Sequence, residues 1–254
     1  MSAPWLSALW AGDPDRAQTL AAAPQGRRAA LAVLYAFNLE IARLPLATET
    51  PLVAEMRLTW WRDVIEGAPA PGAPLAEALQ AVIETYALPP ALLAELVAAR
   101  QADVAREPFA DAPALWRYLD QSAGHLYGAA AGILAGPEGP PSEAKAPLAA
   151  FGRAAGLAAF LRAAAALKAR GWDALGPLPL APLIREAQAE LRKARAGRRA
   201  VPKTLAPALL PGWQTAGLLA QAAAVPERVA AGALGLSEFR RRGGLFWQAL
   251  TGRW

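Results

Sequence analysis

Helical periodicity, which runs almost from one end of the chain to the other, is the sequence feature that most constrains the fold. Apolar residues recur at helical spacing, and the alternation typical of β-strands is hard to find. Alanine and leucine dominate and favour helix, while β-branched residues are scarce. The pattern predicts an all-α protein with helices over Arg27–Leu44, Pro51–Glu66, Ala73–Tyr86, Pro89–Ala105, Ala112–Ala135, Ser142–Arg170, Leu180–Ala196, Gly212–Ala224 and Ser237–Thr251.

The breaks between these helices are short clusters of proline and glycine. They lie at Gly67–Pro74, Gly136–Pro141 and Gly176–Pro182, and none has the length or polarity of an interdomain linker. Hydrophobic residues make up 55% of the 254 residues, which is enough for a sizeable core. We therefore expect one domain over residues 1–254.

Two segments bear on the location of the protein. Residues 1–20 lack a basic region followed by an apolar core, so we expect no signal peptide. The run Thr204–Pro226 carries no charged residue and is long enough to span a bilayer. Prolines, a glycine and two glutamines interrupt it, however, so the sequence predicts a loop followed by a buried helix. We expect a cytoplasmic protein.

The formal net charge is +5, which favours an anionic partner. A helix-turn-helix and an aromatic–basic platform are not evident in the sequence, so we expect no nucleic acid. The positively charged residues gather in two groups, one within residues 192–199 and one at Arg240–Arg242, and either group is alternatively a solvated surface. The residues that we expect to contact an anionic membrane surface are Arg192, Lys193, Arg195, Arg198 and Arg199.

Small residues mark one face of the predicted helix over residues 112–135. Ala123, Gly124, Gly128 and Gly132 are spaced mostly four apart. Glycine inside a helix costs about 1 kcal/mol relative to alanine, so such a row indicates that another helix crosses closely there. This helix is therefore predicted to lie in the middle of a bundle.

Three segments together resemble a known family. They are Leu34–Asn38 (LYAFN), Met56–Asp63 (MRLTWWRD) and Tyr118–Gly124 (YLDQSAG). In order and spacing they are similar to motifs of the squalene/phytoene synthase family, and Phe246–Trp254 resembles the tail of its shorter bacterial members. The resemblance implies the isoprenoid synthase fold, a helical bundle around a central cavity.

The resemblance also implies a chemistry. Active members condense two prenyl diphosphates head to head, using two aspartate-rich motifs that face each other across the cavity. Aspartates at i and i+4 share one helix face. Two such faces hold magnesium ions, which bridge and neutralise the diphosphate so that it can leave.

This sequence departs from that pattern at both places. Where the first aspartate pair would follow the Tyr35 motif, the chain has Ala42 and Arg43, and then a predicted turn at Leu44–Leu46. Where the second motif would follow Arg162, the chain has four alanines. We therefore expect a catalytically inactive protein without a metal cofactor. Magnesium would be bound only if the protein is nevertheless an active transferase.

Polar and aromatic residues of the motifs remain candidates for a degenerate ligand site. Three arginines can hold an anionic head group or form ion pairs with Asp63, Asp103 or Glu66. The tyrosines and the asparagine line the former cavity or make internal hydrogen bonds, and Trp60 and Trp61 are expected to pack. The candidates are Tyr35, Asn38, Glu40, Arg57, Trp61, Arg62, Asp63, Tyr118, Ser122, His125 and Arg162.

His125 is the single histidine of the chain. Its spacing predicts that it shares a helix face with Tyr118 and Ser122. Without a second histidine or any cysteine it is a poor metal ligand, so a hydrogen-bonded core or cavity position is expected.

Family members without the acidic motifs include the mitochondrial complex I assembly factor, and Asn38-Leu39-Glu40 resembles that branch. This resemblance implies an assembly or scaffold factor, peripheral to the inner membrane, with respiratory-complex subunits as partners. Two alternatives stay open. One is an active prenyl-diphosphate transferase, and the other is a protein that binds a polyprenyl or other lipid.

Overall fold

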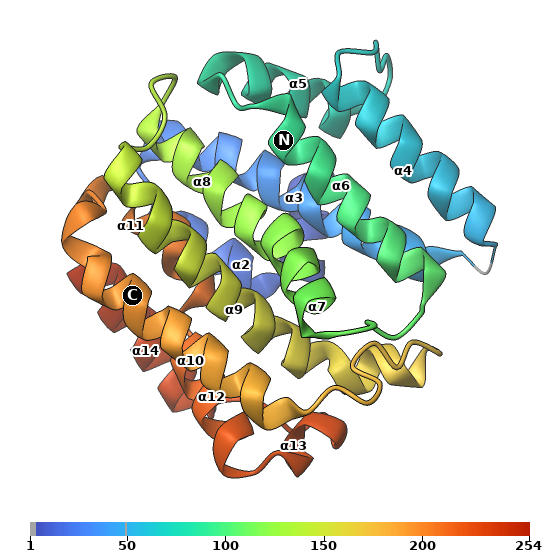
Figure 1. Ribbon diagram of the computed structural model, residues 1–254. Coiled ribbons are helices and arrows are strands. Elements are labelled where there is room, and N and C mark those ends of the chain that lie inside the picture. The colour runs from blue at the N-terminus through green and yellow to red at the C-terminus, as the bar shows by residue number, and fades with distance from the viewer. Residues whose placement is uncertain (1–3, 49) are drawn as a thin grey trace.

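The computed structural model describes residues 4–48 and 50–254, and within these ranges it contains helices and no strand (Figure 1). The predicted all-α class is confirmed, and each predicted helix is present close to its predicted ends. The helices are α1 (Pro4–Gly12), α2 (Pro14–Thr19), α3 (Gln25–Ala47), α4 (Pro51–Ile65), α5 (Pro74–Tyr86), α6 (Pro90–Ala105), α7 (Ala112–Leu119), α8 (His125–Ala135), α9 (Ser142–Ala169), α10 (Leu180–Ala196), α11 (Ala206–Leu209), α12 (Thr215–Ala224), α13 (Glu227–Ala230) and α14 (Glu238–Thr251).

The helices form a bundle with α8 in its middle. Helix α8 contacts α3, α6 and α9, while α4 and α5 cover α3 and α6 on one side. Helices α10 and α12 cover α9 on the other side, where α14 also lies (Figure 1). A π-helical segment, Asp120–Gly124, joins α7 to α8, so the predicted helix over residues 112–135 is continuous but changes register within it.

Two parts of the chain differ from the sequence prediction. Helices α1 and α2 were not predicted, and α1 packs against α3. The predicted turn at Leu44–Leu46 is wrong, because α3 continues through Pro45 to Ala47. Pro45 lacks the N–H group that would donate to the Ile41 carbonyl, so α3 loses one hydrogen bond in its last turn but continues to Ala47. The uncharged run after Thr204 begins with short helical pieces, where a loop was predicted, and continues with α12, where a helix was predicted.

Helices α3 and α9 are long and apolar enough to cross a membrane by length and composition. Within the apolar window of each helix, 67% and 61% of the residues, respectively, are buried inside the bundle. The core helices of a bundle have these properties because they are surrounded by other helices. Their hydropathy is therefore accounted for by the fold.

The predicted close crossing is present where the π segment meets α9. A Cβ atom placed on Gly152 would lie 2.9 Å from the Cα of Gly124, and one on Gly156 would lie 2.9 Å from the Cβ of Ala123. Real Cβ atoms essentially never approach other atoms so closely. Glycine on α9 thus allows the two backbones to meet, and this close contact offsets the cost of glycine in a helix interior.

Replacing Gly152 with alanine is expected to lower the free energy of unfolding by about 1–3 kcal/mol, because backbone atoms of Gly124 must move. Chemical denaturation followed by circular dichroism measures this change. Gly26→Ala is the matched control, since its Cβ would meet no atom within 4 Å. Equal stability of the two variants would show that the crossing is not tight.

Candidate functional site

A central cavity of about 240 Å³ lies between α3, α6, the α7–α8 helix and α9. Three of the predicted site residues line it, namely Asn38, Tyr118 and Ser122. The other lining residues are Arg16, Ala42, Leu46, Arg100, Asp103, Leu119, Ala123, Leu126, Tyr127, Ala155, Gly156, Ala159, Phe160, Ala163, Leu167 and Trp172.

A buried charged network forms one wall of the central cavity. The Arg100 Nη1 group donates to the Asp103 carboxylate at 3.1 Å and to the Tyr118 hydroxyl at 3.0 Å. Burial raises the pKa of Asp103, and the positive charge of Arg100 offsets part of that rise. Burial also raises the pKa of Tyr118, so its hydroxyl stays neutral at physiological pH. The wall therefore presents one guanidinium whose charge is matched by one carboxylate.

A second polar group enters the cavity from α2. The Arg16 guanidinium lies 5.6 Å from the centre of the Tyr35 ring. The Tyr35 hydroxyl and the Asn38 Oδ1 atom are buried without a hydrogen-bond partner within the described residues. Burial raises the pKa of Tyr127 to about 12, although Arg16 opposes the rise. The interior thus holds neutral polar groups and a cation that pairs with Asp13 at 3.1 Å, and its unpaired atoms are positions for water or a small polar ligand.

Both positions that the resemblance assigns to aspartates belong to this cavity. Ala42 of α3 and Ala163 of α9 line it. Its one carboxylate is Asp103, which already pairs with Arg100. Within residues 4–48 and 50–254, no group of three or more His, Cys, Asp or Glu side chains is placed to hold a metal ion. The donor set therefore does not fit a magnesium–diphosphate cluster, which needs several carboxylate oxygens.

The candidates from the tryptophan motif lie outside the central cavity. Arg57 and Glu40 form an ion pair at the surface, with 2.8 Å between Nη2 and Oε1. Trp61 is buried and packs against Phe37, with 5.1 Å between the ring centres. Trp60 packs beside Trp61 and is partly exposed. Two further candidates, Arg62 and Asp63, are exposed.

The predicted ion-pair partners of the arginines are wrong. Arg57 pairs with Glu40, and Arg162 pairs with Asp15 at 3.4 Å. Asp103 pairs with Arg100, its neighbour on the same helix. The difference arises because α2, which was not predicted, brings Asp15 to α9.

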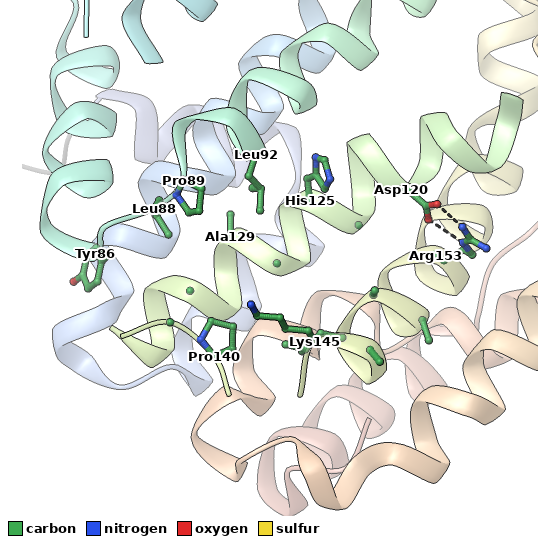
Figure 2. A pocket seen from close by; sticks show the side chains of 18 of the residues that line it. Tyr86, Leu88, Pro89, Leu92, Asp120, His125, Ala129, Pro140, Lys145 and Arg153 are labelled. Carbon is green, nitrogen blue, oxygen red and sulfur yellow. Dashed lines mark hydrogen bonds and ion pairs between the residues drawn. The ribbon is translucent and has the colours of Figure 1, made fainter. Parts of the chain in front are cut away.

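An outer groove of about 920 Å³ lies on the other face of α8 (Figure 2). His125 lines this groove, so it does not share a face with Tyr118 and Ser122 as predicted, because the π segment changes the register. Its Nε2 atom lies 3.6 Å from the Glu95 carboxylate. Asp120 and Arg153 form a bidentate ion pair that joins the π segment to α9 (Figure 2).

The floor of the outer groove is made of small residues, and its sides are apolar. Gly128, Ala129 and Gly132 of α8 form part of the lining, and Leu88 and Leu92 come from the start of α6 and the turn before it (Figure 2). Charged residues from α9, α10 and the loop before α9 line it as well, namely Glu138, Lys145, Arg153, Glu190 and Lys193. The groove is therefore amphipathic, and it is larger than the central cavity although it contains neither family acid position.

Four polar residues of the central cavity were missed as site residues by sequence reasoning, namely Arg16, Arg100, Asp103 and Tyr127. For Arg100 a signal existed, because it follows Leu96 and Val97 on the otherwise apolar face of α6 and precedes Asp103 by three residues. For Arg16 there was none, since α2 is short and its position depends on packing at a distance in the sequence.

Comparison with known proteins agrees with this architecture. The sequence model of a family described as "Squalene/phytoene synthase" matches residues 9–175. A solved structure titled "Crystal structure of a dehydrosqualene synthase in complex with ligand" superposes with a TM-score of 0.74. That match has 14% sequence identity and covers 97% of this chain and 94% of that chain, so it shows the shared fold. The search of curated proteins found no match.

Proposed function

Because the chain belongs to the squalene/phytoene synthase family, we propose that it is a non-catalytic member that acts as an assembly or scaffold factor. The observation that carries the proposal is that alanines, Ala42 and Ala163, occupy both acid positions at the central cavity. Magnesium keeps its waters unless carboxylates replace them. The remaining charges, Arg16, Arg100 and the paired Asp103, offer no such replacement.

The size of the central cavity supports the same conclusion. Ligand pockets typically measure about 300–1,000 Å³, whereas this cavity measures about 240 Å³. Large side chains narrow it, among them Phe160 and Trp172. A volume below that range supports the proposal of a non-catalytic protein.

The purified protein is expected to form no squalene- or phytoene-type product from farnesyl or geranylgeranyl diphosphate with magnesium. The reason is the missing carboxylate set at Ala42 and Ala163. Extraction and mass spectrometry of the products measure this, with an active member of the family as positive control. Turnover above the no-enzyme background would establish the alternative, an active prenyl-diphosphate transferase.

An exposed apolar stripe on α4 supports a protein-binding role. Leu52, Val53, Met56 and Trp60 are 40–64% exposed, and their spacing places them on one helix face. Mixed charges surround the stripe, including Glu55 and the Arg57–Glu40 pair. Methionine and aromatic residues among mixed charges are typical of protein interfaces. The resemblance to the complex I assembly branch makes respiratory-complex subunits the partners to look for.

The assembly role is tested by affinity purification from cells that contain respiratory complexes. Complex I subunits are expected with the wild-type chain and are expected to be lost from a Leu52→Ser, Met56→Ser variant. The comparison variant carries Val225→Ser at the end of α12, where the side chain is also exposed. Recovery of no respiratory subunit by any of the three would contradict the assembly role.

The outer groove favours a second candidate function, the binding of a single-chain lipid. Its volume of about 920 Å³ falls within the range of ligand pockets. Apolar Leu88 and Leu92 would contact a chain, and Lys145 and Lys193 would contact an anionic head group. Native mass spectrometry and solvent extraction of the purified protein test this, and the absence of any bound lipid counts against it.

A further inference from the structure

Helix α14 lies on the surface with its large apolar side chains facing solvent. Phe239, Phe246, Trp247 and Leu250 are 57–87% exposed. They follow one another at spacings that place them on one face of the helix, which we term the α14 stripe. A helix of a soluble bundle normally turns such a face towards the core. Here no residue of α14 is buried.

Polar contacts fix this outward orientation. Arg241, on the opposite face of α14, forms an ion pair with Asp15. Gln248 donates from Nε2 to the main-chain oxygen of Trp213 at 3.1 Å. A Cβ atom on Gly244 would lie 3.7 Å from the Trp213 ring. The stripe therefore faces outward because the other face of the helix is attached to the bundle.

A group of cations lies beside the end of the α14 stripe. It surrounds a depression of about 990 Å³ that Trp247 and Thr251 of α14 also line. No ion pair with a side chain is found for any of these cations within the described residues, although Arg195 and Arg198 both donate to the main-chain oxygen of Trp254. This cation cluster consists of Arg195, Arg198, Arg199, Lys203 and Arg253.

The electrostatics of the cation cluster favour an anion. Burial lowers the pKa of Arg195 and of Arg198, and Arg195 and Arg253 lower that of Arg198 further. The Arg198 Nε group is a buried donor without a partner, while its Nη2 group donates to the main-chain oxygen of Trp254. Like charges that crowd one another are stabilised by a bound anion such as a phosphate.

We propose that α14 docks the protein onto a bilayer that contains anionic phospholipids, with the α14 stripe among the acyl chains and the cation cluster on the lipid phosphates. An interfacial helix combines a Phe/Trp/Leu face with flanking basic residues. Arg240 supplies further positive charge on α14 itself, whereas Arg242 pairs with Glu238 at 3.2 Å. The exposed cations beside the stripe favour an anionic bilayer over a second copy of the chain, which carries the same net positive charge.

This inference goes beyond the proposed function, because membrane docking does not depend on whether the central cavity is catalytic. It also refines the predicted basic surface. Arg195, Arg198 and Arg199 gather at α14, whereas Lys193 lines the outer groove and lies 3.7 Å from Glu190. Helix α4, with its own stripe, lies on the opposite side of the molecule (Figure 1). Docking through α14 therefore leaves α4 accessible.

Co-sedimentation of the full chain with vesicles tests the proposal. We expect binding to phosphatidylcholine vesicles that contain phosphatidylglycerol, weaker binding at high salt, and little binding to phosphatidylcholine alone. A Phe246→Ser, Leu250→Ser variant is expected to bind roughly tenfold or more weakly. The matched control is Leu52→Ser, Met56→Ser on α4, with similar exposure, which should bind as the wild type does.

A second pair of variants tests the cation cluster. Arg199→Ala, Lys203→Ala, Arg253→Ala together remove three exposed cations and should weaken binding about a hundredfold, at roughly fivefold for each cation. Arg62→Ala, Arg117→Ala removes exposed cations elsewhere and should change binding little.

Three results would overturn the proposal. The first is no binding to anionic vesicles, even if inorganic phosphate alone binds to the cation cluster. The second is equal binding to neutral vesicles. The third is unchanged binding of the α14 variant, or a change of its oligomeric state that would identify the stripe as an interface between copies of the chain.

Discussion

Replacing Asp103 with alanine is expected to lower the free energy of unfolding by about 3–5 kcal/mol. The substitution leaves the Arg100 guanidinium in the wall of the central cavity without a countercharge. Tyr118 would remain its hydrogen-bond partner, but a neutral hydroxyl does not balance a buried cation. For a chain of this size the loss corresponds to a fall of roughly 6–20 °C in melting temperature, measured by calorimetry or circular dichroism.

Two comparisons identify the cause of that loss. Asp63→Ala removes an exposed carboxylate and should change stability by no more than about 0.5 kcal/mol. Arg100→Met combined with Asp103→Leu removes both charges, and it should recover much of the stability that Asp103→Ala loses. If the double variant were as unstable as the single one, lost packing rather than an unbalanced charge would be the reason.

Trp172→Ala is expected to be about as destabilising, at roughly 3–5 kcal/mol. Trp172 is buried among the rings of Phe109, Tyr118 and Phe160, with ring centres 6.1–6.4 Å from its own. Its Nε1 group donates to the main-chain oxygen of Glu107 at 2.9 Å. The truncation removes these contacts and enlarges the central cavity, which Trp172 lines.

Denaturant unfolding of Trp172→Ala beside Trp247→Ala measures the effect. Trp247 is exposed on α14, so its loss should change stability by no more than about 0.5 kcal/mol. A small effect at Trp172 would indicate that the aromatic cluster relaxes into the space, and the cavity would then be more adaptable than its packing suggests.

Most of the fold followed from the sequence because its signals are local. Apolar periodicity located α3 to α10, and proline at the first turns of α4, α5 and α6 marked where they begin. The small residues Ala123 and Gly124 indicated a close helix crossing that the structure contains, whereas Gly128 and Gly132 of the same row line the outer groove. Helices α1 and α2 were missed because short helices owe their stability to tertiary contacts rather than to their own sequence.

The site was only partly predictable because its composition depends on tertiary packing. Asn38, Tyr118 and Ser122, which line the central cavity, belong to the motifs. The absence of acidic residues at Ala42 and Ala163 was also visible in the sequence. The position of His125 was not, since a π segment of five residues shifts the face that it occupies. Arg16 reaches the cavity from another helix, which no local pattern encodes.

The outward orientation of the apolar face of α14 could not be predicted from the sequence either. Its apolar residues predicted a helix but could not say which face the bundle would cover. That choice depends on the ion pair of Arg241 with Asp15 and on the contact of Gln248 with Trp213, which join distant parts of the chain.

We propose that the central cavity does not bind a diphosphate through magnesium. Isothermal titration calorimetry with a non-hydrolysable farnesyl diphosphate analogue, with magnesium and then with a chelator, tests it most directly. We predict no binding, or weak binding that is the same in both conditions. Tight binding that the chelator abolishes would contradict the account, because it would require metal ligands in a cavity where Ala42 and Ala163 provide none.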